Sequence, residues 1–278
     1  MLIGAHESIS GGIYRAIERG VEDGCECIQV FVKNSNRWVA KPIPENEADK
    51  FIKLTKEHNI SVCCHSSYLI NMASKNIEIR EKSFNSLVDE LHRCDMLNIP
   101  YYVIHPGSHL GAGEDEGLKL VAEVIDNAYD EHGFNVSVLL EITAGQGTNL
   151  GYDLSHFSRI FELSKYSDKL NICLDSCHMY SAGFDIVQDY DRVFDRIFSA
   201  FGEKIKVFHL NDSKKNFASK LDRHELIGKG TIGLNFFRRV VNDKRFDNVL
   251  GILETPIEKD ATYREEVALL KSLKGDKI

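Results

Sequence analysis

The sequence contains no apolar run near the roughly 20 residues that a membrane-spanning helix needs, so we expect no membrane span. Its first residues lack a basic segment followed by an apolar segment and a cleavage site, so secretion is not expected either. Proline is scarce, at 5 of 278 residues, and the 20 glycines follow no repeat, which excludes collagen-like and disordered chains. What is left is a packed globular protein.

The seven cysteines include no CxxC pair, so a zinc site built from thiolates is not expected. Their number is odd and most lie in apolar runs, where cysteine behaves as a small core residue. A reducing, cytoplasmic compartment is the expected location. The net charge of −8 disfavours a general nucleic-acid coat, since such proteins carry a basic stripe. Bound divalent ions would weaken that objection, because they concentrate positive charge in one cleft.

Eight short β-branched and apolar segments alternate with longer amphipathic ones. This pattern indicates a parallel sheet covered by helices, at about 35 residues per βα unit. We predict an α/β fold, a single-domain (β/α)₈ TIM barrel over residues 1–278, with a doubly wound open sheet as the alternative. The predicted strands are Leu2–Ala5, Cys27–Val32, Ser61–Cys64, Tyr101–Ile104, Val136–Leu140, Asn171–Leu174, Ile205–Phe208 and Val249–Leu253.

Apolar residues at helical spacing predict helices over Asn76–Leu97, Glu116–Glu131 and Tyr263–Leu273. Three acids are expected as N-caps or first-turn residues of other helices: Asp153, Asp185 and Asp260.

A histidine or an acid stands at the carboxyl end of six predicted strands: His65, His105, Glu141, Asp175, His209 and Glu254. In a barrel these ends share the face on which active sites lie. Two local motifs, Asp175-Ser-Cys-His178 and Asp222-Arg-His224, bring the set to nine.

A single residue of this kind is more often a hydrogen-bonded structural group or a helix cap than a ligand. Six in succession are different, because imidazoles and carboxylates gathered in one bowl need cations to offset their desolvation and repulsion. Five histidines and four acids suit two or three Zn²⁺ ions, or a similar ion such as Mn²⁺.

The chain resembles the endonuclease IV family of zinc-dependent apurinic/apyrimidinic (AP) endonucleases over essentially its whole length. The matching stretches are GAHESISGG (4–12), HSSYLIN (65–71), HPGSHLG (105–111), LEITAGQGTNLG (140–151), CLDSCHMYSAGFD (173–185), HLNDSK (209–214), DRHELIGKGTIG (222–233) and LETP (253–256). The resemblance implies a DNA-repair hydrolase that cleaves duplex DNA on the 5′ side of an abasic site. It also implies a 3′-hydroxyl and a 5′-deoxyribose phosphate as products, and a 3′-end trimming activity.

The resemblance further implies three zinc ions and a partition of the ligands among them. It assigns His65 and His105 to one ion, with Glu141 bridging to a second ion that is completed by Asp175, His209 and Glu254. It assigns His178, Asp222 and His224 to the third. Glu141 is the implied catalytic residue, since the bridged pair holds the water that attacks phosphorus.

Tyr68 and Leu69 match the family residues that insert into the duplex at the gap. The alternative is that they begin a helix and pack inward. The family commonly has Arg two residues before the Trp, whereas here Asn36 takes that place and Arg37 directly precedes Trp38. We expect Arg37 to reach a DNA phosphate. Other departures are Ser66 for Asp, Ser176 for Thr, and Ala218-Ser219-Lys220 for Gly-Ser-Arg.

The segment from Gly228 to Gly233 fits GxGxxG and opens a predicted helix, but no strand directly precedes it, so no nucleotide cofactor is expected. Its backbone N–H groups are expected to be free to contact DNA phosphate. His6 and Gln29 end the first two strands; they either support the ligands or make ordinary hydrogen bonds within the barrel.

Three other functions stay open at this point. A sugar isomerase or epimerase would share the barrel and the metal chemistry, but would leave the Asp222-Arg-His224 motif unexplained. A lesion-binding protein would use metals only to shape its site, and a structural metalloprotein would not bind nucleic acid. The expected partner is duplex DNA with an abasic site, and the expected state is a monomer.

Overall fold

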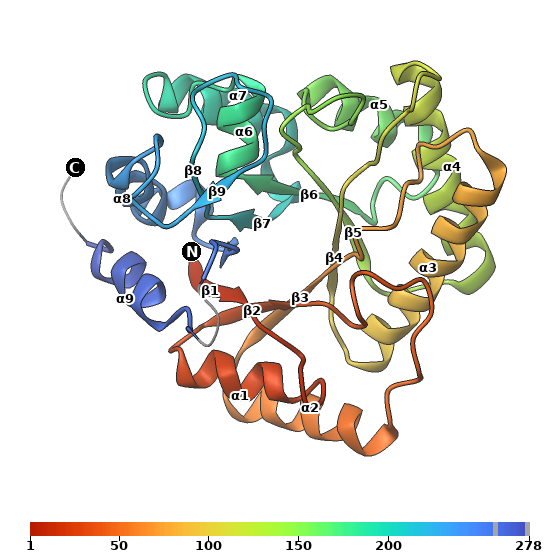
Figure 1. Cartoon of the computed structure of the whole chain (residues 1–278), viewed down its shortest axis with the longest axis horizontal. Helices are drawn as coiled ribbons and strands as arrows, with labels where there is room; N and C mark the ends of the chain where they lie inside the picture. Colours follow the sequence, from red (N-terminus) through yellow and green to blue (C-terminus); the bar gives the residue numbers. More distant parts are fainter. Residues whose placement is uncertain (258–260, 276–278) are drawn as a thin grey trace.

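Eight parallel strands close into a barrel in the computed structural model, which describes residues 1–257 and 261–275 (Figure 1). The strands are β1 (Leu2–His6), β2 (Cys27–Val30), β3 (Ser61–His65), β4 (Tyr101–Ile104), β5 (Ser137–Glu141), β6 (Leu170–Asp175), β7 (Ile205–His209) and β10 (Leu250–Leu253). Closure comes from β1, which pairs with both β2 and β10. The predicted TIM barrel is confirmed, the open sheet is wrong, and every predicted strand is present within two residues at either end.

Helices ring this barrel on the outside (Figure 1). They are α1 (Arg15–Glu22), α2 (Glu45–Glu57), α3 (Ile77–Met96), α4 (Glu114–His132), α5 (Leu154–Leu163), α6 (Ser176–Ala182), α7 (Tyr190–Phe201), α8 (Leu234–Asn242) and α9 (Arg264–Ser272), with short 3₁₀ turns η1 (Gly202–Lys204) and η2 (Lys244–Phe246). The three helices predicted from periodicity are confirmed as α3, α4 and α9. None of the described helices is long and apolar enough to cross a membrane.

The predicted helix caps have different outcomes. Asp153 caps α5, where its carboxylate accepts a hydrogen bond from Ser155 N at 2.9 Å. The prediction for Asp185 is wrong: its carboxylate accepts from Gln188 N at 2.9 Å in a turn, and α7 begins only after Asp189. The short carboxylate of aspartate accepts backbone hydrogen bonds both in turns and at helix N-termini, so the residue type alone does not distinguish a turn from a helix cap. Asp260 lies outside the described residues.

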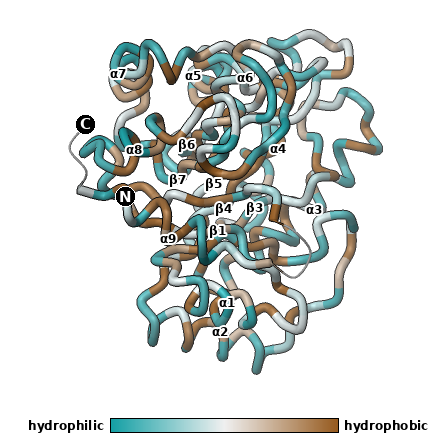
Figure 2. The backbone as a smooth tube through the Cα atoms, turned by 60° about the vertical axis from the view of Figure 1, so that its left-hand side comes forward, coloured by the Kyte–Doolittle hydropathy of each residue, from teal (hydrophilic) through white to brown (hydrophobic). Residues whose placement is uncertain are grey.

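Apolar residues fill two regions of the molecule. A small cluster inside the barrel contains Cys27, Cys63, Val103, Leu139, Cys173, Val207, Leu250 and Ile252, and a larger one lies between the strands and the helices. Figure 2 shows this division as apolar stretches along the strands and alternating polar and apolar stretches along the outer helices. All seven cysteines are buried and unpaired, which confirms their predicted role as small core residues.

One excursion departs from the regular βα pattern. Between β7 and α8 the chain forms a two-stranded antiparallel ribbon of β8 (Asp212–Ser213) and β9 (His224–Glu225). The turn between these strands is held against α6, because Ala218 N donates to Tyr180 O at 3.0 Å and Lys220 N donates to Ser181 O at 2.9 Å. The ribbon carries Asp222 and His224 toward the carboxyl ends of the barrel strands.

Ala218 adopts a backbone conformation that favours glycine, at φ 57°. A Cβ atom costs about 1–2 kcal/mol in this region, while glycine loses about 0.4–1 kcal/mol more entropy on folding. We therefore expect Ala218→Gly to raise the free energy of unfolding by roughly 0.5–1 kcal/mol, measured by urea denaturation. Ala112→Gly, in a loop at a residue without positive φ, is the control and is expected to be neutral or destabilising. Equal effects of the two substitutions would contradict the assignment of strain to Ala218.

Candidate metal centre

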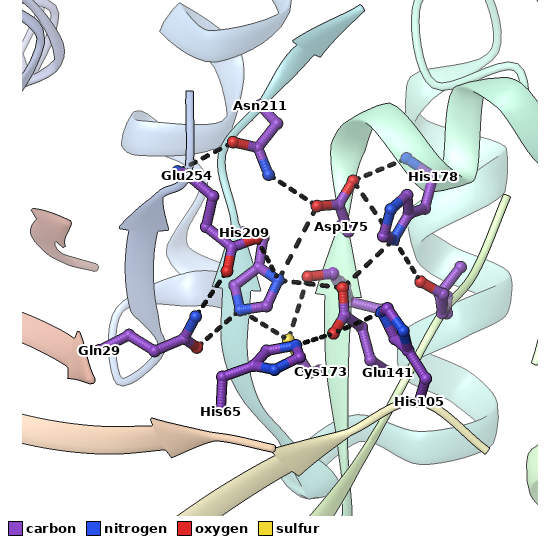
Figure 3. Close-up of polar contacts among 12 residues, drawn as sticks. Gln29, His65, His105, Glu141, Cys173, Asp175, His178, His209, Asn211 and Glu254 are labelled. Atoms are coloured by element: carbon purple, nitrogen blue, oxygen red, sulfur yellow. Dashed lines mark hydrogen bonds and ion pairs between the residues drawn. The ribbon is translucent and has the colours of Figure 1, made fainter. Parts of the chain in front are cut away.

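The nine predicted ligands converge at the carboxyl end of the barrel, and all of them except Asp175 and His209 line one cavity there. Figure 3 shows how the side chains around Glu141 face one another. Four of them are the last residues of their strands: His65, Glu141, Asp175 and His209. His105 and Glu254 directly follow β4 and β10, His178 lies in the first turn of α6, and the ribbon supplies Asp222 and His224. The cavity has a volume of about 240 Å³, and His209 and Asp175 lie fully buried beneath it. Convergence follows from the fold, because parallel strands of a barrel end on one face.

The candidate ligand atoms form five groups in which they lie within 4.8 Å of one another, and two of these groups include a cysteine, Cys173 or Cys177. The other three contain histidines and acids alone. These three groups are His65, His105 and Glu141; Glu141, Asp175, His209 and Glu254; and His178, Asp222 and His224. They coincide with the partition that the family resemblance implies. The geometry thus brings every predicted ligand to its expected neighbours, while metal binding itself stays a prediction.

Glu141 is the centre of this arrangement, and its carboxylate is almost fully buried. One oxygen, Oε2, lies 2.9 Å from His65 Nε2 and 3.1 Å from His105 Nε2. The other, Oε1, lies 3.1 Å from His209 Nδ1 and 3.2 Å from His178 Nδ1. A single carboxylate therefore faces four imidazoles, and each of its oxygens belongs to a different side of the cluster.

Two buried ring nitrogens test whether these residues suit a metal ion. Neither His105 Nε2 nor His224 Nε2 makes a hydrogen bond to a described residue. Each lies 3.1 Å from a carboxylate oxygen, of Glu141 and Asp222 respectively, but without hydrogen-bond geometry. Buried polar atoms without partners are rare and call for an explanation such as a bound ion. A cation placed between each imidazole and its carboxylate would accept the lone pair of the ring nitrogen and that of the carboxylate oxygen. The donor set therefore fits Zn²⁺ or a similar divalent ion.

The electrostatics of the cluster also call for cations. Burial alone would raise the pKa of Glu141, but the imidazoles of His105 and His209 hold this pKa well below its usual value. Burial alone would lower the pKa of His65 and of His224, but their carboxylate partners, Glu141 and Asp222, raise each of these pKa values to about 9. Protons on the histidines thus balance the acids, and metal ions that displaced these protons would supply the same compensation.

Two amide side chains hold the ligands in orientation. Gln29 Oε1 lies 2.8 Å from His209 Nε2, while Gln29 Nε2 donates to Glu254 Oε1 at 2.6 Å and lies 3.0 Å from His6 Nδ1. With its Nε2 facing Gln29, His209 presents Nδ1 to the cluster. Gln29 thus contacts two of the predicted ligands directly, whereas His6 contacts Gln29 and lies 3.6 Å from Glu254 Oε1.

Asn211 plays a similar part and was missed in the sequence. Its Nδ2 donates to Asp175 Oδ2 at 2.7 Å, and its Oδ1 accepts from Glu254 N at 3.0 Å. The sequence did offer one signal: Asn211 stands two residues after His209, and alternate residues of an extended chain point to the same side. Ser176 Oγ in turn contacts the backbone of Asn211, at 2.7 Å to O and 2.9 Å to N. Threonine has the same hydroxyl, which explains how serine can replace it here.

Tyr68 stands at the rim of the cavity with 65% of its surface exposed. Its ring centroid lies 5.4 Å from that of Phe31 and 6.3 Å from that of His65. The alternative that Tyr68 begins a helix and packs inward is wrong, because residues 66–70 form a turn and α3 begins only at Ile77. Leu69 beside it is half-buried. An exposed ring at the mouth is available to a ligand, and the predicted insertion into DNA stays a prediction.

Arg37 lies in the loop between β2 and α2 and is exposed. Within residues 1–257 and 261–275 its guanidinium has no hydrogen bond or ion pair. Its loop contacts that of Tyr68 directly, since Tyr68 N donates to Ser35 O at 3.2 Å. Both predicted DNA contacts are therefore on neighbouring loops, and a phosphate contact by Arg37 stays a prediction.

The expectation that the Gly228–Gly233 loop offers free N–H groups is wrong. The fully buried carboxylate of Asp212 accepts hydrogen bonds from the N–H groups of Gly228 at 3.0 Å, Gly230 at 3.1 Å, Ile232 at 2.9 Å and Gly233 at 3.2 Å. A Cβ atom on Gly230 would lie 2.4 Å from Asp212 Oδ1, which explains the glycine. The carboxylate of Asp212 thus occupies the anion-binding concavity that these N–H groups form. The loop opens α8 as predicted, and Asp212 anchors the base of the ribbon.

Comparisons with known proteins show the family and the fold. A family model described as xylose isomerase-like TIM barrel matches residues 17–273. The chain is 47% identical over 276 residues to a probable endonuclease 4 of Chloroflexus aurantiacus, covering 97% of each chain. The crystal structure of endonuclease IV from Thermus thermophilus superposes with a TM-score of 0.88 at 30% identity, covering 98% of each chain. A D-tagatose 3-epimerase-like protein reaches a TM-score of 0.70 at 17% identity, over 98% of this chain and 95% of that one, which shows the shared fold alone.

Proposed function

Because the chain belongs to the endonuclease IV family of metal-dependent DNA-cleaving hydrolases, we propose that it incises duplex DNA on the 5′ side of an abasic site. The proposed products are a 3′-hydroxyl, which a polymerase can extend, and a 5′-deoxyribose phosphate. Trimming of blocked 3′ ends is the proposed second activity. Residues 1–278 act as one catalytic domain, with three Zn²⁺ ions as the cofactor and Mn²⁺ as a partial substitute.

The observation that carries this proposal is the third donor group beside the Glu141-centred pair. His178 comes from α6, while Asp222 and His224 come from the ribbon between β7 and α8. An epimerase usually needs one or two metal ions, so a third group at the same cavity is unexplained by sugar chemistry. A phosphodiester is anionic, and a mouth lined by carboxylates accepts it only when cations outweigh their charge. A larger metal cluster meets that requirement.

The bound ions would supply Lewis-acid stabilisation of the phosphate and a water of lowered pKa. Residues of this chain would hold and orient the ions: Glu141 lies between two donor groups, and Gln29 and Asn211 fix the orientation of His209 and Asp175. No protein nucleophile is then required. The histidines keep the acids ionised: burial raises the pKa values of Glu141, Asp222 and Glu254, but the imidazoles that face them hold all three low.

Recognition is proposed to use the rim of the cavity. An abasic nucleotide has no base to unstack, so extruding it from the duplex costs less than extruding a normal one. Tyr68 and Leu69 would fill the gap, and Arg37 would contact a phosphate. The ribbon and the loop that follows it carry exposed basic residues, which would attract the DNA backbone locally despite the net charge of −8. They are Lys214, Lys215, Lys220, Arg223 and Lys229.

A nicking assay tests this proposal. The substrate is a labelled duplex with one tetrahydrofuran abasic analogue, and the same duplex without the lesion is the control. We expect one nick on the 5′ side of the analogue, a 3′ end that a polymerase extends, and no cleavage of the control. Chelation is expected to abolish the nick and added Zn²⁺ to restore it, because the donor groups supply no other electrophilic catalyst.

The other outcomes identify the alternatives. Binding of the damaged duplex without a nick would support a lesion-binding protein, and turnover of a ketose without a nick would support an epimerase. If the protein neither binds the damaged duplex nor turns over either substrate, a structural metalloprotein is the remaining alternative. Undiminished incision after chelation would overturn the metal-dependent chemistry.

A further inference from the structure

A buried lysine lies behind the two loops that are proposed to contact DNA. Lys33 comes three residues after β2, and its side chain is 0% exposed. Its ammonium group contacts four oxygens: Trp38 O at 3.1 Å, Ser86 Oγ at 2.9 Å, Asp89 Oδ2 at 3.0 Å and Glu90 Oε1 at 3.2 Å. A buried charge is tolerated only when such partners surround it. Lys33 therefore fixes its own loop, through Trp38 O, to helix α3.

Glu90 connects the same helix to the second loop, and it is also almost fully buried. Its Oε1 faces Lys33, while its Oε2 accepts from Ser67 N at 3.0 Å and from the Tyr102 hydroxyl at 2.7 Å. Ser67 immediately precedes Tyr68. One carboxylate thus contacts two loops. One oxygen holds Lys33 of the loop between β2 and α2 (residues 31–44, the Arg37 loop), and the other holds the backbone just before Tyr68.

The remaining contacts come from the same side of α3. Ser86, Asp89, Glu90 and Arg93 follow the i, i+3, i+4, i+7 spacing of one helix face. Arg93 Nε donates to Asp89 Oδ1 at 3.0 Å, and its guanidinium reaches Ala40 O at 3.3 Å. The Arg37 loop is therefore attached to α3 at Lys33, Trp38 and Ala40, and the direct bond from Tyr68 N to Ser35 O completes the link between the loops.

We propose that the buried Lys33–Glu90 pair is a positioning device that holds the Arg37 and Tyr68 loops in one fixed arrangement for lesion recognition. The inference rests on the proposed function. Neither residue lines the metal cavity, so the device acts on the loops and not on the reacting atoms. Loops that are ordered before binding lose less conformational freedom in the complex, which tightens binding.

Lys33→Met tests the device, since methionine keeps an unbranched, buried side chain but loses the charge and the donors. We expect the KM for the abasic duplex to rise about 10- to 100-fold through loss of preorganisation, with a much smaller change in kcat. Hydrolysis of bis(p-nitrophenyl) phosphate, a small diester that needs the cavity but not the loops, is expected to stay at the wild-type rate. The matched control is Lys119→Met, an exposed lysine of helix α4 paired with Asp115, which is expected to leave both reactions unchanged.

The single tryptophan, Trp38, gives a readout that needs neither DNA nor metal. Its carbonyl is bound by Lys33, so its fluorescence anisotropy reports the order of this loop alone. We expect the anisotropy to fall in Lys33→Met and not in Lys119→Met. If Lys33→Met does not fold, Glu90→Gln keeps the side-chain shape and is expected to change KM and anisotropy in the same direction but less.

The outcomes separate this inference from the proposed function. A wild-type protein that fails to nick would refute the proposed function, whereas the anisotropy would still test the link between Lys33 and the loop. Wild-type anisotropy and KM in the folded variant would overturn the inference. Equal losses with the duplex and the small diester would do so as well, because they would show a general structural role.

Discussion

Replacing Glu141 with glutamine is expected to lower the rate of abasic-site incision by about 100- to 1,000-fold or more, the scale of losing a key charge at a reacting phosphate. Glutamine has the same shape, but it is neutral and offers one oxygen instead of two. Glu141 faces four imidazoles with both oxygens, so the substitution removes the anion shared by two donor groups. We expect one fewer ligand oxygen, a neutral and weaker ligand in place of the other, and a lower zinc content at the paired site.

Binding of the abasic duplex is expected to change little in this variant, because the exposed rim residues and the ribbon are not altered. Single-turnover incision measures the rate, anisotropy titration of a labelled duplex measures affinity, and plasma mass spectrometry measures zinc. Glu123→Gln on the exposed face of α4 is the matched control and is expected to behave as wild type. Full activity of Glu141→Gln, or a loss explained by failure to bind DNA, would refute the assigned role.

The barrel and its ligand face could be predicted because both depend on local patterns. Short apolar strands alternate with amphipathic helices, and a barrel converts the end of each strand into a position on one face. His65, Glu141, Asp175 and His209 are the last residues of their strands, so their convergence required no knowledge of packing. The ends of the elements were less certain, as Asp185 shows: a turn and a helix cap use the same side-chain acceptor.

Contacts between distant segments could not be predicted in this way. The N–H groups of the Gly228–Gly233 loop looked free, but their partner is Asp212, which lies 16 to 21 residues earlier and reaches them only through the β8–β9 ribbon. Lys33 presented the same difficulty. A lysine in a polar loop is ordinarily solvated, and its burial here depends on oxygens of α3 more than 50 residues later.

Replacing Asp222 with asparagine is expected to remove one equivalent of bound zinc per chain and to slow incision by about 100-fold, the scale of losing one electrostatic group in a phosphodiesterase site. Asp222 is the only carboxylate of the third donor group, at 3.2 Å from His178 Nε2 and 3.1 Å from His224 Nε2. Its loss would leave two imidazoles, fewer than the three protein ligands that zinc sites usually have. The Glu141-centred groups are intact in this variant, so their zinc is expected to stay bound.

This substitution also separates the nuclease from the barrel enzymes that act on sugars. If the third group serves phosphodiester hydrolysis, its removal lowers incision of the duplex and hydrolysis of a small diester alike, because both need the cavity. Asp168→Asn is the matched control: it is exposed and lies just before the amino end of β6, on the opposite face of the barrel. The Asp222 side chain is 45% exposed, so the variant is expected to fold with wild-type stability. Unchanged zinc content together with unchanged incision would show that the third group is not part of the catalytic centre, and the argument against an epimerase would fail with it.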